Sequence, residues 1–300
     1  MASEQLETIR ELVSGADLGT LTLPERRALM DSAGSPPPAG TRVDPVDANG
    51  VVAEWVVAAG VSAERVLLHF PGGAYHLGSP ARLRGLLALV SAAAQVRVLS
   101  IGYRLAPENP FPAAVEDGLA AYRWLIARGT PAQQVVISGD SSGGGLALAV
   151  LVALRDTGDP LPGAAVVLSP WTDLGLSGES LRSRADVDVL LTPAGAREAA
   201  DWYLAGQDAR HPYASPLYAD LHGLPPMLIQ AGDAEILRDD ATRFAAAAQA
   251  AGVDVTLEIW PEMPHVWHAF AGMVPEADEA VERIGRWLRE DRQPVGIGGG

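Results

Sequence analysis

The chain has 300 residues, which suit one large α/β domain or two small ones, and its hydrophobic content of 48% can fill a substantial core. Asp and Glu (37) outnumber Lys and Arg (22), and this net charge of −15 is spread along the chain, which argues against nucleic-acid binding because phosphates require a basic patch. The absence of cysteine excludes disulfides, thiolate chemistry and cysteine-bound metals.

The N-terminal region is expected to hold two short helices, at residues 3–14 and 24–31. Its first seven residues are charged and lack an apolar segment, and the most hydrophobic stretch, residues 86–96, is shorter than the ~20 residues that span a bilayer. We therefore expect a soluble, cytoplasmic protein. Residues 34–40 contain three prolines and two glycines and are interpreted as a linker, so residues 1–40 are predicted to form N-terminal cap helices and a linker.

A hairpin is predicted next, with Asn49-Gly50 as its turn and residues 51–57 as its second strand. Strands and helices then alternate, which predicts an α/β fold with a mostly parallel sheet covered on both faces. The expected strands are 65–70, 96–102, 134–139, 164–168, 227–231 and 254–260, and the expected helices are 80–94, 112–128, 142–156, 235–251 and 275–290.

Residues 171–224 interrupt this alternation. They are rich in loop-forming residues and hold one expected helix, 193–204. Ligands of open α/β sheets bind at the carboxyl ends of the strands, so an insertion there would form a lid. We expect a catalytic domain at 41–292 with a cap insertion at about 171–224, and a flexible tail at 293–300.

The segment Gly139-Asp140-Ser141-Ser142-Gly143 fits the Gly-x-Ser-x-Gly pattern of a nucleophile elbow. A β-branched run precedes it and an apolar helical run follows it, so Ser141 is predicted to lie on a sharp turn between a strand and a helix. Side chains at Gly139 and Gly143 would clash there, because strand and helix pass close to each other. The alternative interpretation is a Gly/Ser-rich turn at a helix start.

A serine nucleophile needs a base and an orienting carboxylate, which follow it in the order acid, then histidine, in this kind of fold. His265 lies in a loop after the last expected strand, on the sheet edge where Ser141 is predicted. His268, three residues later, is expected to be a supporting or helix-start residue. The acid should follow strand 227–231, and spacing alone leaves Asp233 and Glu235 open, while Asp239 and Asp240 are expected to be solvated or capping. Oxyanion donors should come from the Ser142 N–H and from a glycine-rich loop at Pro71-Gly72-Gly73-Ala74.

These motifs together resemble the bacterial hormone-sensitive-lipase-like esterases of the α/β-hydrolase fold, over about residues 43–290. The resemblance rests on residues 71–79, Tyr103–Glu108 with 111–114, the 139–145 elbow, 169–174 and Pro264-His265. The stretch 214–217 and the acidic loop look like the monoterpene ε-lactone hydrolase-like members. The resemblance implies an eight-stranded sheet with a helical cap and, through Leu237-Arg238-Asp239, Glu235 as the acid with Asp233 as runner-up. It also implies Gly72 and Gly73 as oxyanion donors. The usual His-Gly-Gly-Gly reads Pro71-Gly72-Gly73-Ala74 here, which puts the support of that loop and the level of activity in question.

The resulting hypothesis is a serine carboxylic-ester hydrolase acting on short-chain acyl esters or lactones through Ser141, His265 and Glu235, with no metal and no cofactor. Substrate contacts are expected from six residues: Tyr75, His76, Asp140, Trp171, Trp202 and Tyr203. The partner is a small-molecule ester or lactone, with no nucleic acid and no membrane, and the sequence leaves monomer or homodimer open. The alternatives are a ligand-binding protein or dehydratase on the same scaffold, as in plant relatives of which the receptors lack a triad member, and, more weakly, a peptidase.

Overall fold

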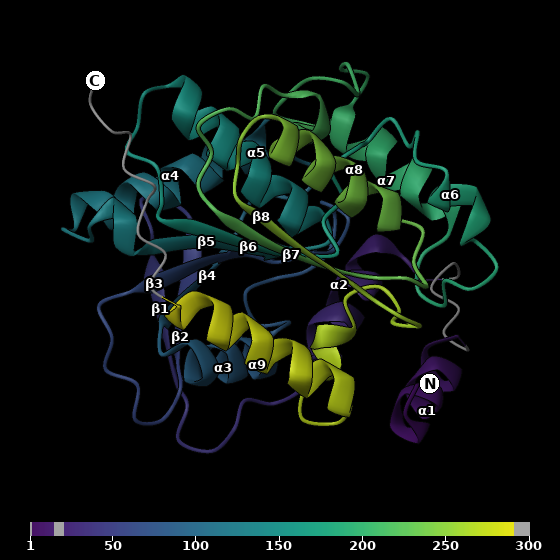
Figure 1. Ribbon diagram of the computed structural model, residues 1–300, viewed down its shortest axis with the longest axis horizontal. Coiled ribbons are helices and arrows are strands. Elements are labelled where there is room, and N and C mark those ends of the chain that lie inside the picture. Colours follow the sequence, from purple (N-terminus) through teal and green to yellow (C-terminus); the bar gives the residue numbers. More distant parts are fainter. Residues whose placement is uncertain (1, 15–20, 291–300) are drawn as a thin grey trace.

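The computed structural model describes residues 2–14 and 21–290, so the predicted tail at 293–300 lies outside the described residues (Figure 1). One eight-stranded sheet has the strand order β1-β2-β4-β3-β5-β6-β7-β8. Strand β2 pairs antiparallel with β1 and with β4, and the remaining pairs are parallel. The strands are β1 Arg42–Asp47, β2 Val52–Val57, β3 Val66–Phe70, β4 Arg97–Gly102, β5 Val135–Asp140, β6 Ala164–Leu168, β7 Met227–Gly232 and β8 Val255–Trp260.

The sheet and its hairpin agree with the sequence prediction, because each predicted strand recurs within a few residues of its expected ends. Helix α8 begins later than expected, at Arg238 rather than at residue 235, since residues 233–237 form a turn. The helices are α1 Glu4–Ser14, α2 Leu23–Ser32, α3 Arg84–Ala94, α4 Ala113–Ala127, α5 Ser142–Asp156, α6 Ser180–Ser183, α7 Pro193–Leu204, α8 Arg238–Ala250 and α9 Pro275–Arg289, and short 3-10 turns lie at η1 Ala132–Gln134, η2 Pro216–Tyr218 and η3 Trp267–Phe270.

Helices cover both faces of the sheet and bury two separate cores. Helices α3 and α9 pack together on one face, and α4, α5 and α8 lie on the other (Figure 1). All six residues of β5 are buried, and so are the first thirteen residues of α5, because this helix packs against β3, β5 and β6 of the sheet and also against α4 and η2. Helix α9 instead buries one stripe that includes Ala277, Val281, Ile284 and Leu288, as expected for an amphipathic helix with one solvent face.

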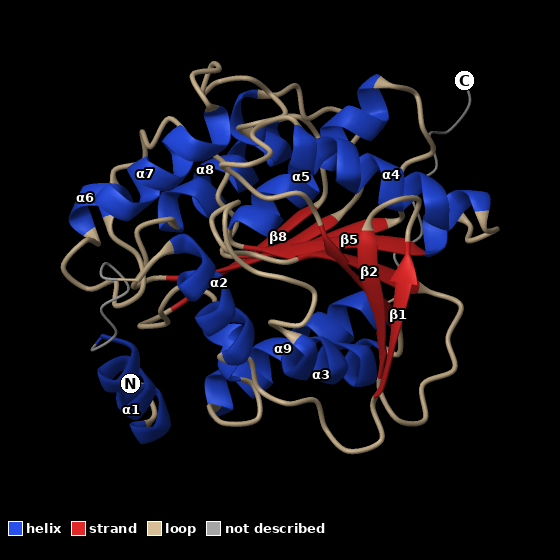
Figure 2. Ribbon diagram, turned by 180° about the vertical axis from the view of Figure 1, so that it is seen from behind, coloured by secondary structure: helices blue, strands red, loops and turns tan. Residues whose placement is uncertain are grey.

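The chain between β6 and β7 carries α6, α7 and η2 in place of a simple crossover. Figures 1 and 2 place α2, α6 and α7 toward the same end of the sheet. The side chain of Arg27 in α2 donates to the His76 carbonyl oxygen and forms an ion pair with Glu108. Helix α2 and the 171–224 segment therefore both lie at that end, whereas α1 packs beside α9, where Ser3 binds Glu276 and Leu6 is buried in the core of that face. In the part of the chain that is described, no helix combines the length and apolarity needed to cross a membrane.

Candidate active site

Ser141 occupies the turn between β5 and α5 with φ 55° and ψ −125°. This backbone conformation is costly for a residue with a side chain, and close packing imposes it. A Cβ on Gly139 would lie 2.1 Å from the Gly143 carbonyl oxygen, and one on Gly143 would lie 2.0 Å from the Phe70 carbonyl oxygen. The turn is fixed further by hydrogen bonds from Ser141 N to Leu168 O (2.9 Å) and from Trp171 N to Ser141 O (2.9 Å). The glycines are therefore required for the reason predicted from the sequence.

His265 lies in the loop after β8 with its Nε2 atom 2.8 Å from the Ser141 Oγ atom. Its Nδ1 atom makes a very short contact with the Glu235 Oε2 atom. Burial disfavours the charged imidazole, but the carboxylate of Glu235, together with Asp188 and Asp140, outweighs it and raises the pKa of His265 above its ordinary value. The side chains of Ser141, His265 and Glu235 therefore form a continuous chain of contacts from hydroxyl to imidazole to carboxylate.

Glu235, rather than Asp233, is the carboxylate beside His265. Glu235 is fully buried, and its second oxygen, Oε1, accepts hydrogen bonds from Ser169 Oγ (2.9 Å) and Gly232 N (2.7 Å). The Asp233 side chain is 37% exposed and pairs with Arg184 and Arg238. Sequence reasoning did not single out Ser169, although it stands in the quoted 169–174 segment. Its Oγ also accepts from Val266 N (3.2 Å), so this one hydroxyl contacts both the loop of His265 and the carboxylate of Glu235.

The glycine-rich loop after β3 differs from expectation at Gly72. The Gly72 N–H donates to the Asp140 Oδ1 atom at 2.8 Å, so the expectation that it serves as an oxyanion donor is wrong for this conformation. Among the described residues, the N–H groups of Gly73 and Ala74 have no protein acceptor. Ala74 and Tyr75 both adopt left-handed backbone (φ 52° and 63°), which turns the loop toward the elbow.

Ser142 contributes its side chain as well as its backbone. Its Oγ atom accepts a hydrogen bond from the Tyr75 N–H at 3.2 Å, which ties the glycine-rich loop to the first residue of α5. Pro71, which stands where the family usually has histidine, accepts at its carbonyl oxygen from the Tyr103 hydroxyl (2.6 Å). These two bonds hold the loop at Tyr75 and at Pro71.

Asp140 is fully buried and binds the glycine-rich loop rather than facing an open cleft. Its Oδ2 atom is 3.0 Å from Arg82 Nη1, and its Oδ1 atom lies 3.3 Å from His69 Nε2, an ion-pair distance without hydrogen-bond alignment. Burial disfavours the ionised carboxyl, but Arg82, His69 and the Gly72 N–H outweigh it and hold the pKa of Asp140 well below its usual range. With both oxygens engaged inside the protein, Asp140 has no free acceptor for the substrate contact expected from the sequence.

Aromatic side chains of the loop and of α7 pack against each other. Tyr75 stacks on Tyr203 with ring centroids 3.7 Å apart, and His76 meets Trp202 edge-on at 5.0 Å. Tyr75, Tyr203 and Trp171 are each at most 2% exposed. Three of the expected substrate residues are therefore buried in the contact between α7, the loop and the elbow.

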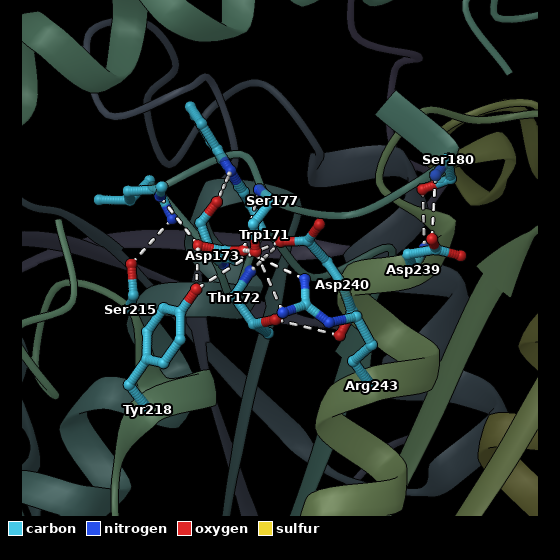
Figure 3. A network of polar contacts seen from close by, with 12 residues as sticks. Trp171, Thr172, Asp173, Ser177, Ser180, Ser215, Tyr218, Asp239, Asp240 and Arg243 are labelled. Atoms are coloured by element: carbon cyan, nitrogen blue, oxygen red, sulfur yellow. Dashed lines mark hydrogen bonds and ion pairs between the residues drawn. The ribbon is translucent and has the colours of Figure 1, made fainter. Parts of the chain in front are cut away.

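Two polar residues near the site are buried and hydrogen-bonded: His268, which lies in η3 in agreement with its expected supporting or helix-start position, and Asp240, which was not expected to be buried. His268 is fully buried, and its Nε2 atom lies 2.9 Å from Gln230 Oε1, while burial lowers its pKa to about 3. Asp240, expected to be solvated or capping, is only 4% exposed, and its Oδ1 atom accepts from Thr172 N and Asp173 N at 2.8 Å each. Figure 3 shows this carboxylate at the centre of a polar network that joins α8 to residues 171–180.

A cavity of about 360 Å³ lies beside the 233–237 turn. Its walls come from Arg184, Val187 and Val189 after α6, from Asp233 and Ala234, and from Arg10 and Glu262. Ser141 and His265 do not border it, so it is not the space where an ester would meet the hydroxyl. Within residues 2–14 and 21–290, no group of His, Asp and Glu side chains has an arrangement that could hold a metal ion.

Comparison with known proteins gives a consistent result. A family model described as the alpha/beta hydrolase fold matches residues 67–269. The chain is 47% identical over 300 residues to an acetyl-hydrolase of Streptomyces hygroscopicus, which covers 96% of this chain and 97% of that protein. It is 35% identical over 244 residues to an esterase of Acinetobacter venetianus, covering 81% and 80% of the two chains.

Solved structures agree in fold. An esterase/lipase from an uncultured bacterium superposes with a TM-score of 0.93 at 44% identity, covering 96% of this chain and 99% of that one. An esterase of the bacterial hormone-sensitive lipase family gives a TM-score of 0.93 at 43% identity, covering 96% and 98%.

Proposed function

This chain belongs to the α/β-hydrolase fold family, and within it to the bacterial hormone-sensitive-lipase-like esterases, and we propose that it hydrolyses short-chain carboxylic esters with Ser141, His265 and Glu235 as a catalytic triad. Membership of this family makes it a carboxylic-ester hydrolase. The observation that supports the triad is the 2.8 Å contact between Ser141 Oγ and His265 Nε2, with Glu235 on the other imidazole nitrogen. A hydroxyl near neutral pH becomes a useful nucleophile when a base can take its proton in this way.

Each step moves one proton through His265. The Ser141 oxygen adds to the ester carbonyl carbon while His265 Nε2 takes the hydroxyl proton. The tetrahedral oxyanion collapses, the bond to the alcohol oxygen breaks, and Nε2 returns the proton to the leaving alcohol. Water then adds to the acyl-enzyme with its proton going to Nε2, and the second collapse releases the carboxylic acid and restores the Ser141 hydroxyl. Glu235 stays ionised and stabilises the imidazolium in both halves.

The oxyanion donors in this proposal are the backbone N–H groups of Gly73, Ala74 and Ser142. Gly72 is replaced in that role because its N–H already binds Asp140. Unpaired donors on a fixed loop suit a transient negative charge, since they need no reorganisation when the charge forms. Asp140, Tyr103 and the Ser142 hydroxyl keep that loop in place.

The aromatic packing of α7 on the loop favours a small acyl group. The segment 171–224 and helix α2 are proposed as the cap over the site. A methylene that enters a pocket gains about 0.8 kcal/mol, whereas one that meets the closely packed contact between α7 and the loop gains nothing. The relative from Streptomyces hygroscopicus is named an acetyl-hydrolase, and one similar structure was soaked with p-nitrophenyl butyrate, which agrees with short acyl groups.

A panel of p-nitrophenyl esters from acetyl to dodecanoyl, with ε-lactones alongside, tests this function. We expect kcat/KM to peak between acetyl and hexanoyl and to collapse by dodecanoyl, with the Ser141→Ala variant as the blank. Covalent labelling by an organophosphonate should occur at Ser141. No turnover of any ester or lactone by the wild type would instead support the ligand-binding or dehydratase alternative, and steady rates on long-chain triglyceride emulsions would remove the short-chain assignment.

A further inference from the structure

The turn at residues 233–237, which carries Glu235, is held from outside by the segment that follows β6. We call residues 180–191 the clamp segment. Its Ser180 hydroxyl donates to the Ile236 carbonyl oxygen (2.7 Å) and accepts from the Asp239 N–H (3.0 Å), and Figure 3 shows Ser180 facing Asp239. Its Arg184 side chain reaches Asp233 Oδ1 at 3.1 Å. The clamp segment therefore contacts this turn and the start of α8 at several points.

Asp188 makes the most specific of these contacts. Its Oδ2 atom accepts a hydrogen bond from the backbone N–H of Ile236 at 2.8 Å, the residue directly after Glu235. Its Oδ1 atom accepts from Leu190 N and Leu191 N, both at 2.9 Å. All these donors are backbone groups, so the carboxylate is fixed in place by the fold of its own loop and in turn fixes the peptide beside Glu235.

We propose that Asp188 is a positioning residue for the triad, which holds the peptide next to Glu235 and adds a second negative charge on the side of His265. This inference rests on the proposed function, because it assigns Asp188 a task within the same site. Asp188 acts on the reacting atoms indirectly, by holding the 233–237 turn and through the electric field of its negative charge.

The charges around His265 support this assignment. The imidazole interacts with carboxylates from three elements: Glu235 of the turn, Asp188 of the clamp segment and Asp140 of β5, while His268 of η3 is buried and neutral. Burial raises the pKa of Asp188, and His265 opposes that rise, so the two groups stabilise each other's charged forms. A carboxylate near an imidazole favours the imidazolium, the species that forms when Ser141 loses its proton.

The test is the pH profile of kcat/KM on p-nitrophenyl butyrate, whose acid limb reports the base of the free enzyme. Removing a negative charge lowers the pKa of the imidazole, so the acid limb of Asp188→Asn should move to lower pH. We expect a shift of roughly half a unit, less than a carboxylate in direct contact produces. Loss of an acceptor for Ile236 N should also reduce the plateau kcat by roughly tenfold with little change in KM.

Two control variants separate charge from structure. Ser180→Ala removes a hydrogen bond of the clamp segment without changing its charge. The plateau kcat of this variant should therefore fall, while the acid limb of its pH profile stays in place. Asp186→Asn removes an exposed carboxylate two residues away and should match the wild type. An acid limb that does not move in Asp188→Asn, or that moves equally in Asp186→Asn, refutes the role of Asp188. Failure of the proposed function would look different, because Ser141→Ala would then keep its activity.

Discussion

Replacing Asp240 with asparagine should change how the stability of the protein depends on pH. Asp240 lies in the first turn of α8, and its Oδ1 atom accepts the backbone N–H groups of Thr172 and Asp173 (Figure 3). Burial, and next to it the charge of Asp173, raise the pKa of Asp240 to about 8. The amide oxygen of asparagine can accept the same two hydrogen bonds. The substitution therefore removes a titrating group and keeps its contacts.

The size of the effect follows from the two pKa values. The ordinary pKa of the group is 3.8 and its folded pKa is about 8, so between these values the folded protein holds a proton that the unfolded chain has released. The stability that this group contributes is full below pH 3.8 and is lost as the pH rises through the folded pKa. The free energy of unfolding falls by about 1.4 kcal/mol per pH unit in that window, or about 2.7 kcal/mol between pH 5 and pH 7.

Urea unfolding of the wild type and of Asp240→Asn at pH 5, 6 and 7 measures this difference directly. The difference in free energy of unfolding between the two proteins should change by about 1.4 kcal/mol per pH unit in favour of the variant. Asp186→Asn, which removes an exposed carboxylate, should run parallel to the wild type. If the curve of Asp240→Asn is also parallel to the wild type, Asp240 is ionised in the folded protein and the reasoning fails.

Three further predictions test the site. Glu235→Gln should lose roughly 10⁴ in kcat, because it loses the charge that stabilises the imidazolium, whereas Asp233→Asn should stay near wild type; the opposite ranking in p-nitrophenyl butyrate assays would transfer the role to Asp233. Ser142→Ala leaves the Tyr75 N–H without its acceptor, so we expect a loss of about 1–3 kcal/mol in urea unfolding together with a lower kcat/KM, and an unchanged midpoint would show that this bond is dispensable. Ala74→Gly relieves a left-handed backbone that costs a side-chain-bearing residue about 1 kcal/mol, so the variant should gain stability by up to that amount while kcat/KM is retained; a loss of stability in the same assay would contradict the strain argument.

The fold could be predicted because its signals are local. Strands β3, β5, β6 and β7 are short and fully buried, and most of their residues are apolar. The elbow glycines must be small for reasons of packing that the motif already implies. The sequence predicts the start of α8 too early, because glutamate has a high helix propensity and Glu235 therefore looks like a helical residue. Its carboxylate instead accepts the Gly232 N–H and the Ser169 hydroxyl, and these contacts hold the turn in place of a first helical turn.

The parts of the site that were missed depend on contacts between distant segments. Ser169 binds a carboxylate 66 residues away, and no spacing rule connects the two. Gly72 was expected to donate to the substrate because the motif shows which residues are glycines and not where their N–H groups point. The direction of the Gly72 N–H is set by the buried Asp140 carboxylate, which lies 68 residues further along the chain and accepts its hydrogen bond.

The chain that follows β6 contacts Ser141 and Glu235 of the proposed triad and the loop that carries His265, which has a consequence for how this protein can change. Trp171 N binds the Ser141 carbonyl oxygen, the Ser169 hydroxyl lies between Glu235 and the loop of His265, and Asp188 holds the peptide after Glu235. The same chain continues into α7, which packs on the glycine-rich loop through Tyr203. A substitution in the proposed cap that shifts this chain therefore moves the catalytic groups as well. Substrate range and catalytic rate should change together here, because the proposed cap and the contacts that hold the proposed triad belong to one continuous segment.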